Sequence, residues 1–344
     1  MENRLSVALR EASRRPDFLN LINTNFHECG LAPDGSMLAE AASRYLSSEE
    51  HRGYSPDPSG LPLLREAIAE YYARYGVATS PGRVLVTASA SESYTHIFNG
   101  TCTRGGAVLL PRPGYPLFED VARRSGLEPR FYDLHAEREW RVDLEGIRAR
   151  LDEGNVEAVI VISPNNPTGA VADETEIRAI GALCREHDAV LVTDEVFSEF
   201  RFGATSLARP AELCPETRCL TINGVSKLFA SPDLKVSWIV VSGPEAAAAE
   251  ALEELEIEND LYLSSSPINQ FVAATLLREG AAFTASVVAE VATRRIAALA
   301  ALDRIASRYP RTIERVDPAG GIHLPLLVPE PPRGEDDEEL AIRL

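Results

Sequence analysis

The sequence predicts an α/β protein, a three-layer sandwich with a mostly parallel sheet of about seven strands, joined to a smaller α+β domain. Short, nearly continuous apolar runs rich in β-branched residues alternate with amphipathic stretches of helical period, which is typical of a parallel sheet covered on both faces. The chain of 344 residues is long for one core and suits a large and a small domain. Beyond Pro244 the composition changes to helical sequence rich in Ala, Glu and Leu.

The predicted strands are apolar runs of strand length that end in polar or turn-forming residues. They are expected at Arg83–Ala88, Ala107–Pro111, Glu157–Ser163, Ala189–Asp194, Arg218–Asn223 and Val236–Ser242, with a weaker strand near Pro129–Leu134. Helices between them are expected at Glu92–Thr103, Leu117–Ser125, Leu144–Asp152 and Glu174–His187.

Three parts follow from this pattern. Residues 1–45 form an N-terminal segment that joins the small domain, 46–244 form the large domain that carries the site, and 245–344 form the small C-terminal domain. Long helices are expected at Glu245–Glu258 and Asn269–Tyr309, followed by a short strand with Gly320 and Gly321. The last residues, Glu338–Leu344, read as a helix that is only starting, so the small domain looks incomplete.

Composition excludes several classes of function. A net charge of −18 argues against nucleic acid as a partner, because phosphate binding needs a basic surface. No stretch approaches a membrane span, and Met1–Arg15 is polar, without a signal-peptide core. The five cysteines are scattered and lack zinc-ligand spacing. We therefore expect a cytoplasmic protein with reduced thiols, no metal site and no membrane partner.

Polar and turn-forming residues gather directly after the predicted strands. Parallel sheets bind ligands outside the carboxyl ends of their strands, so these segments are expected to share one site. The segments are Thr87–Ser91, Pro111–Tyr115, Ser163–Gly169, Asp194–Phe197 and Asn223–Lys227.

Lysine is almost absent from the chain. Only Lys227 and Lys235 occur among the 34 basic residues. Arginine replaces lysine in most salt bridges but cannot form an imine, whereas the pKa of a lysine amine drops when the amine is buried. Drift toward arginine would explain the missing lysines but not the position of Lys227 after a strand. The scarcity therefore indicates amine chemistry.

Three motifs share the order and approximate spacing of one enzyme family. Ser163-Pro-Asn-Asn-Pro-Thr-Gly169, Asp194-Glu-Val-Phe197 and Ser226-Lys227 together resemble the fold-type I pyridoxal-phosphate enzymes, and among them the class I/II aminotransferases. The resemblance runs from about Ile22 to Leu344. It implies pyridoxal 5′-phosphate as cofactor, an amino acid and a 2-oxo acid as substrates, and a homodimer.

The resemblance assigns roles around the cofactor ring. Lys227 would form the internal aldimine and later move a proton between the substrate and the cofactor, with Ser226 beside it in the cofactor site. Asp194 would pair with the pyridinium nitrogen, and Asn166 would donate a hydrogen bond to the phenolic oxygen. Without the other motifs, Asp194 would read as a helix N-cap and Asn166 as an ordinary turn residue.

Further residues are assigned to the phosphate and to the face of the ring. Ser89-Ala90-Ser91 matches the family's phosphate-binding turn at a helix N-terminus, although Ser89 or Ser91 also fits a plain helix cap. Tyr115 falls where the family stacks an aromatic ring on the cofactor. Tyr54, ahead of Gly60, resembles the tyrosine that reaches the phosphate of the neighbouring subunit, with a spacing one residue longer than expected.

The chain also departs from the family's pattern near the cofactor. Phe197 replaces a tyrosine, which removes a hydrogen bond to the phenolic oxygen and should raise the pKa of the aldimine. Gly224 replaces a phosphate-site serine. Lys235 replaces a phosphate-binding arginine, which keeps the charge but loses the bidentate fork.

The C-terminus departs most strongly. Arg343 comes too early to be the arginine that binds the substrate carboxylate in the family, so either the chain is shortened or another group binds that carboxylate. The leading interpretation is an aminotransferase. A lyase or cyclase acting on an amino acid, and a degenerate non-catalytic homologue, remain alternatives, because fold analogy alone does not settle function.

Overall fold

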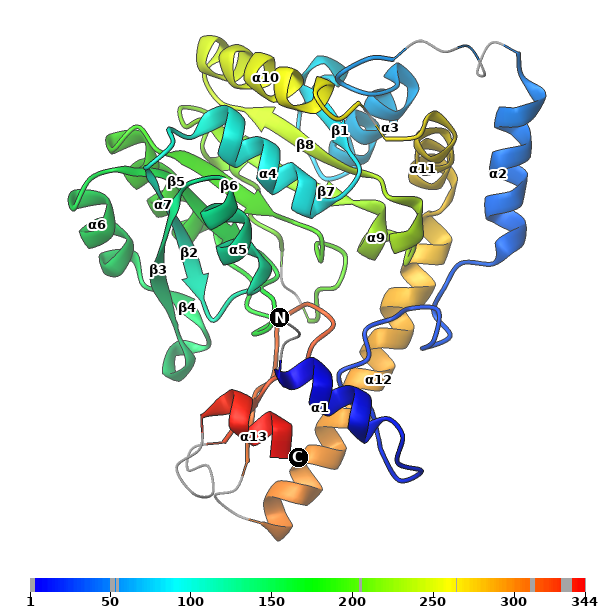
Figure 1. Ribbon diagram of the computed structural model, residues 1–344, viewed down its shortest axis with the longest axis vertical. Coiled ribbons are helices and arrows are strands. Elements are labelled where there is room, and N and C mark those ends of the chain that lie inside the picture. The colour runs from blue at the N-terminus through cyan, green and yellow to red at the C-terminus, as the bar shows by residue number, and fades with distance from the viewer. Residues whose placement is uncertain are drawn as a thin grey trace.

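The computed structural model describes residues 4–49, 53, 56–203, 206–263, 265–309, 313–328 and 336–343. Its centre is an eight-stranded sheet with the strand order β1-β8-β7-β6-β5-β2-β3-β4 (Figure 1). The strands are β1 (Val84–Thr87), β2 (Ala107–Arg112), β3 (Glu128–His135), β4 (Arg141–Val142), β5 (Val156–Ile162), β6 (Val190–Asp194), β7 (Cys219–Gly224) and β8 (Ser237–Ser242).

Most strand pairs are parallel. Strands β3, β2, β5, β6 and β7 pair in parallel, while β8 is antiparallel to β7 and to β1. Strand β1 therefore points the same way as β7. The predicted α/β sandwich with a mostly parallel sheet is confirmed. The strand that the sequence did not reveal is β4, which has two residues and pairs antiparallel with the end of β3.

The continuous apolar runs are explained by burial on both faces of the sheet. Neighbouring residues of a strand point to opposite faces, and Val159 and Ile160 of β5 are both fully buried, in two different core clusters. The same holds for Leu191 and Val192 of β6. The central strands β5 and β6 are therefore apolar at consecutive positions rather than at alternate ones.

Helices cover both faces of this sheet (Figure 1). On one face α4 (Ala90–Thr101), α5 (Leu117–Arg124) and α10 (Glu245–Asp260) pack in a shared core. Helices α6 (Leu144–Asp152) and α7 (Glu174–Glu186) cover the other face, and α3 (Pro62–Ala73) packs over β1 and β8. Helix α10 follows the predicted domain boundary at residue 244, yet it packs beside α4. The boundary itself stays a prediction.

The prediction of one helix over Asn269–Tyr309 is wrong, because the chain bends by 77° between α11 (Pro267–Glu279) and α12 (Ala281–Arg308). Gly280 lies at the break. A Cβ atom there would approach the Phe229 ring to 2.8 Å and the Leu276 carbonyl oxygen to 2.6 Å, so only glycine fits. The hydroxyl of Thr284 in α12 donates to the carbonyl of Leu228, 2.9 Å away.

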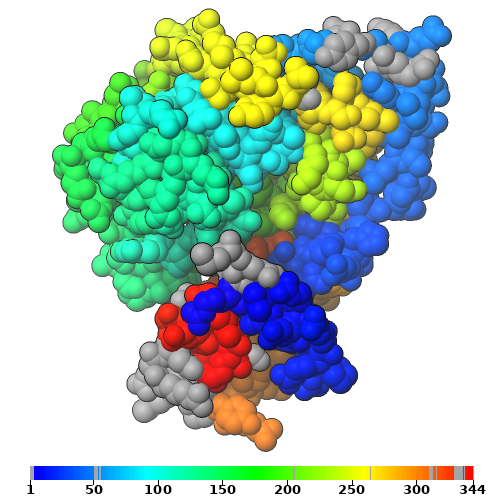
Figure 2. Space-filling model, viewed as in Figure 1, coloured from blue at the N-terminus to red at the C-terminus, as the bar shows by residue number. Residues whose placement is uncertain are grey.

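The two ends of the chain meet below the part of the molecule that contains the eight-stranded sheet. Helices α1 (Arg4–Ala12) and α13 (Asp337–Arg343) lie against each other (Figure 2), and the side chains of Arg4 and Glu338 are 3.9 Å apart. The remaining elements are α2 (Gly35–Ser47), α8 (Pro210–Leu213), α9 (Val225–Leu228), the antiparallel pair β9 (Glu314–Arg315) and β10 (Leu326–Leu327), and 3-10 turns at Pro81–Arg83, Ala136–Arg138 and Pro232–Leu234.

Two further properties concern the same described residues. No single helix among them has the length and apolar composition to cross a bilayer; α11 and α12 meet those criteria only when they are counted together across their bend. Nor does any group of three or more His, Cys, Asp or Glu side chains among these residues have the placement to hold a metal ion.

Candidate active site

The carboxyl ends of β5, β6 and β7 meet at one edge of the sheet. Asp194, the last residue of β6, lies beside Ile162 of β5 and Ile222 of β7. The ladder continues past the strands, because the Ser163 amide donates to the Asp194 carbonyl at 3.0 Å and the Glu195 amide donates to the Ile222 carbonyl at 2.8 Å. The three predicted motifs therefore start from neighbouring points.

Lys227 lies in α9, the short helix that follows β7. The helix is tied to the β8 side because the Val225 amide donates to the Val236 carbonyl at 3.1 Å. The lysine is half-buried, and its Nζ atom is 5.6 Å from the centroid of the Phe26 ring. Burial lowers the pKa of the Lys227 amine from its usual value. The amine is therefore more easily obtained in its neutral, nucleophilic form.

Asp194 is a buried carboxylate held by neutral donors. Its Oδ1 atom accepts from the Val196 amide at 3.0 Å, and its Oδ2 atom accepts from the Tyr94 hydroxyl at 3.2 Å. Burial raises the pKa of Asp194 to about 6, and the neighbouring Glu195 carboxylate adds to that rise. A cationic N–H group placed against this carboxylate would supply the counter-charge that its described neighbours lack.

A buried ion pair anchors the residue next to Asp194. Glu195 accepts from the Arg209 Nε atom at 3.0 Å, and both side chains are almost fully buried. The Arg209 guanidinium also lies over the rings of Tyr75 and Tyr72, with its central carbon 4.5 and 5.6 Å from their centroids. The backbone that presents Asp194 is thereby fixed to α3 and to the segment before α8.

The turn after β5 is built by Asn165 rather than by Asn166. The Asn165 Oδ1 atom accepts from the Thr168 hydroxyl at 2.8 Å and from its amide at 3.2 Å, which leaves the Asn166 side chain half-buried at the edge of the sheet. Gly169 closes the turn at φ 70°, and its carbonyl accepts from the Gly320 amide at 2.8 Å. A side chain at Gly169 would collide with Pro318.

The N-terminus of α4 provides backbone donors at the same edge. Ser89 caps the helix, since its hydroxyl accepts from the Glu92 amide at 3.1 Å, and the Glu92 carboxylate accepts from the Ala88 amide at 2.6 Å. The first amides of a helix have no partner within it. The amides of Ala90 and Ser91 are therefore suited to an anion such as a phosphate, while that of Ala88 is already used.

The remaining predicted residues have looser positions. Tyr115 is 44% exposed and stands edge-on to Phe118, with ring centroids 5.4 Å apart. Ser226 is half-buried beside Lys227 in α9. Lys235 is exposed at φ 53°, and its carbonyl accepts from the Ser265 hydroxyl at 2.8 Å. Tyr54 lies outside the described residues.

Local packing surrounds two of the positions that depart from the family's pattern, Phe197 and Gly224. Phe197 is buried, with its ring centroid 6.4 Å from that of Phe200 and 5.7 Å from that of His323. At Gly224 a Cβ atom would lie 2.7 Å from the Ser237 hydroxyl and 3.0 Å from the Val236 carbonyl oxygen. A serine at position 224 would therefore need β8 to move.

Three residues of the site were not found from the sequence. Tyr94, one turn beyond Ser91, contacts Asp194, while Phe26 and His323 come from the two ends of the chain to the surroundings of Lys227. Tyr94 falls inside a predicted helix, where a buried tyrosine reads as core. The other site residues were located because each directly follows a predicted strand. Phe26 and His323 follow no predicted strand of the large sheet, so their position near Lys227 could not be predicted in this way.

Comparison with known proteins gives a consistent result. A family model described as aminotransferase class I and II matches residues 31–344. The chain is 31% identical to the S-alkyl-thiohydroximate lyase SUR1 of Arabidopsis thaliana, over 66% of this chain and 49% of that protein. It is 33% identical to the probable aminotransferase TAT1 of the same plant, over 61% and 46% of the two chains. The chain thus spans about half the length of these curated relatives.

The fold is shared with solved structures. An alanine aminotransferase from Pyrococcus furiosus superposes with a TM-score of 0.88 at 24% sequence identity, over 98% of this chain and 84% of that one. An aspartate aminotransferase single mutant from Thermus thermophilus superposes with a TM-score of 0.80 at 24% identity, over 100% and 86% of the two chains. At this level of identity the likeness establishes the architecture.

We predict that Asp194 makes the cofactor-free protein less stable as pH rises. The folded chain holds this proton up to about pH 6, whereas an unfolded aspartate loses it near pH 4. Between these values the folded state binds more protons, so stability falls as pH rises through the window and stays lower above it. Asp194→Asn should flatten this dependence and raise the free energy of unfolding at neutral pH by about 3 kcal/mol.

Urea unfolding of the cofactor-free protein at a series of pH values provides the measurement. Asp233→Asn, at an exposed position, is the matched control and should retain the wild-type dependence. Identical pH profiles for wild type and Asp194→Asn would show that the carboxylate carries no such cost.

Proposed function

The chain belongs to the class I and II aminotransferases, and on that premise we propose that it transfers an amino group from an amino acid to a 2-oxo acid, with pyridoxal 5′-phosphate bound covalently at Lys227. The observation that carries the proposal is the half-buried Lys227 amine, whose pKa burial lowers, at the same sheet edge as the buried Asp194. An amine that is easily deprotonated and a carboxylate without a cationic partner suit the two ends of a pyridine aldehyde.

The donor set fits the cofactor's functional groups. Asp194 would accept the ring N–H, and a cationic ring there would relieve the cost that burial imposes on this carboxylate. Asn166 would donate to the phenolic oxygen, where Phe197 has no hydroxyl to offer. Tyr115 would cover one face of the ring. The phosphate would be bound at the α4 N-terminus by Ser89, Ala90 and Ser91, with Ser226 and Lys235 completing its surroundings.

When bound, pyridoxal 5′-phosphate supplies an electron-withdrawing ring that stabilises negative charge at the substrate α-carbon. The chain's own contribution is to orient that ring and to move a proton. The Lys227 Nζ atom, in its neutral form, would accept the proton of the substrate α-carbon and would later give it up again. Asp194, fixed through Tyr94 and the adjacent Glu195–Arg209 pair, would keep the ring in place.

A lyase acting on an amino acid is a second candidate. It is favoured by the relative named as an S-alkyl-thiohydroximate lyase, which shares 31% identity over 229 residues. The same Lys227 and Asp194 would serve elimination, because the choice of bond depends on how the substrate is oriented. Product analysis separates the two.

We also propose a cytoplasmic homodimer. The cysteines support the location, since none of the five forms a disulfide in the structure. Exposed apolar side chains in the N-terminal segment support a second subunit, because Leu19, Leu21 and Ile22 are 77%, 90% and 66% exposed.

We predict that Lys227 carries the cofactor and that the loaded protein transfers amino groups. Borohydride reduction followed by peptide mapping should place the label on Lys227, and Lys227→Ala should remove it. Addition of an amino acid alone should convert the bound cofactor to pyridoxamine phosphate with release of the matching 2-oxo acid. A label on Lys235 would overturn the assignment, and release of ammonia with the oxo acid would establish the lyase instead.

We predict that Lys235→Ala weakens cofactor binding by about one to two orders of magnitude, because a charge-assisted bond to a phosphate is worth roughly 1.5–3 kcal/mol. Lys235→Arg, the matched control, should retain the affinity. A fluorescence titration of the cofactor-free protein measures both. Wild-type affinity for Lys235→Ala would identify Lys235 as a solvated turn residue outside the site.

We predict a dimer in which Tyr54 of each subunit completes the phosphate site of the other. Sedimentation of the loaded protein should give twice the 37.5 kDa mass of one chain, and Tyr54→Phe should weaken cofactor binding while the dimer persists. A monomer with full cofactor occupancy would contradict the shared site.

A further inference from the structure

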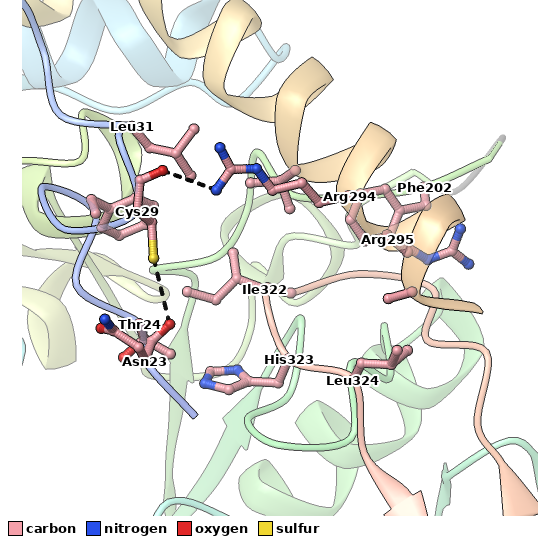
Figure 3. Close-up of a pocket in the computed structure, with 14 residues that line it drawn as sticks. Asn23, Thr24, Cys29, Leu31, Phe202, Arg294, Arg295, Ile322, His323 and Leu324 are labelled. Atoms are coloured by element: carbon pink, nitrogen blue, oxygen red, sulfur yellow. Dashed lines mark hydrogen bonds between the residues drawn. The ribbon is translucent and has the colours of Figure 1, made fainter. Parts of the chain in front are cut away.

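A cavity of about 230 Å³ lies between the N-terminal segment, α12 and the C-terminal segment that carries His323, as Figure 3 shows. Most of the side chains that line it are apolar, among them Phe26, Leu31, Phe202, Val291, Ala298 and Ile322. An apolar cavity of roughly 150 Å³ is large enough to bind benzene. The volume of this cavity therefore suits one branched or aromatic side chain.

Two residues of this lining also contact the surroundings of the candidate active site. The Lys227 Nζ atom is 5.6 Å from the centroid of the Phe26 ring. The His323 ring stands perpendicular to that of Phe197, three residues after Asp194, with ring centroids 5.7 Å apart. Bonds between saturated carbons are about 1.5 Å long, so a leucine side chain extends roughly 4 Å beyond its α-carbon. A substrate whose α-carbon lies beside Lys227 can therefore reach this cavity with its side chain.

The arginines among the described lining residues are already paired with carboxylates. Arg294 donates to Glu290 at 2.8 Å, and Arg295 forms an ion pair with Asp317. Burial lowers the pKa of His323, so the imidazole is uncharged at neutral pH. A carboxylate that entered the cavity would lose its hydration without gaining a cation of its own, which is unfavourable. The cavity therefore disfavours the side chains of glutamate and aspartate.

We propose that this cavity receives the side chain of the amino-acid substrate, and that the substrates are amino acids with branched or aromatic apolar side chains, such as leucine and phenylalanine. This inference rests on the proposed function, because it names the substrate class of that same reaction. Ala298 and Ile322 are the residues that determine specificity. Ala298 contributes only a methyl group and leaves room for the substrate, whereas the larger Ile322 limits the size of the side chain that fits.

The substrate class is tested by adding single amino acids to the cofactor-loaded protein and following the absorbance of the bound cofactor, which responds to transfer and to elimination alike. The half-saturating concentration should be about 100-fold lower for leucine than for alanine or glutamate, because each apolar group that fits the pocket contributes about 10-fold or more. A response to glutamate at an equal or lower concentration than leucine would overturn the substrate class and leave the proposed function intact. A response to no amino acid would contradict the proposed function, and the substrate class with it.

Two variants of the lining test the cavity in the same assay. Ala298→Leu should raise the half-saturating concentration of leucine by about 10-fold or more, because the added side chain fills the cavity, and should leave that of alanine unchanged. Ala297→Leu, at the exposed neighbouring position of α12, is the matched control and should behave as wild type. Ile322→Ala enlarges the cavity and should favour phenylalanine over leucine. Wild-type preferences in both Ala298→Leu and Ile322→Ala would overturn the assignment of the cavity.

The cavity is also tested without the cofactor through Cys29, a half-buried cysteine of its lining. The probe is 4-methylpentanoate, which has the carbon skeleton of leucine but no amino group. In the cofactor-free protein it should slow the alkylation of Cys29 by iodoacetamide, measured by peptide mapping. Glutarate, a dicarboxylate of similar length, is the matched control and should leave the rate unchanged. Equal alkylation rates with 4-methylpentanoate and with glutarate would overturn the selection of apolar side chains by this cavity.

Discussion

The parallel register of β5, β6 and β7 determines where the candidate site lies. Because these strands run side by side in one direction, the Asn166 turn, Asp194 and the Lys227 helix leave the sheet at neighbouring points. Strand β1 runs in the same direction as β7, because both are antiparallel to β8, and the N-terminus of α4 therefore lies at the same edge. Each strand is buried on both faces, so a shift of register would move buried side chains along a closely packed core. The sheet is therefore a rigid frame, and the chemistry is placed at its rim.

Two adjacent carboxylates show how differently one buried position can be treated from the next. Glu195 forms an ion pair with Arg209, and this pair holds the backbone of the loop in place. Asp194 accepts hydrogen bonds from neutral donors only, and the unfavourable burial of its charge raises its pKa. A buried charge without a partner is expensive for stability and is typical of functional sites. Of these two consecutive residues, Glu195 anchors the loop and Asp194 is available for the proposed chemistry.

The parts of this arrangement that could be predicted from the sequence are those that depend on short-range pattern. Continuous apolar runs located the strands of the sheet except β4, whose two residues leave no such run. Residues that directly follow those strands, such as Lys227 and Asp194, could be placed at a common edge. The break at Gly280 could not, because a helical pattern continues through one glycine, and the close approach of the Phe229 ring to that glycine arises only in the folded chain. His323 and Phe26 reach the site through tertiary packing, which leaves no local signal.

Helix α12 is attached directly to the turn that presents the lysine. Its Thr284 hydroxyl binds the carbonyl of Leu228, the residue after Lys227, and Phe229 fills the bend at Gly280. With 28 residues the helix is about 42 Å long, so a tilt of a few degrees about its first turn sweeps the far end through several ångströms. The N-terminal end of α12, about which such a tilt would turn, is joined to the backbone beside Lys227. The orientation of the helix is thereby coupled to the position of the amine on which the proposed chemistry depends.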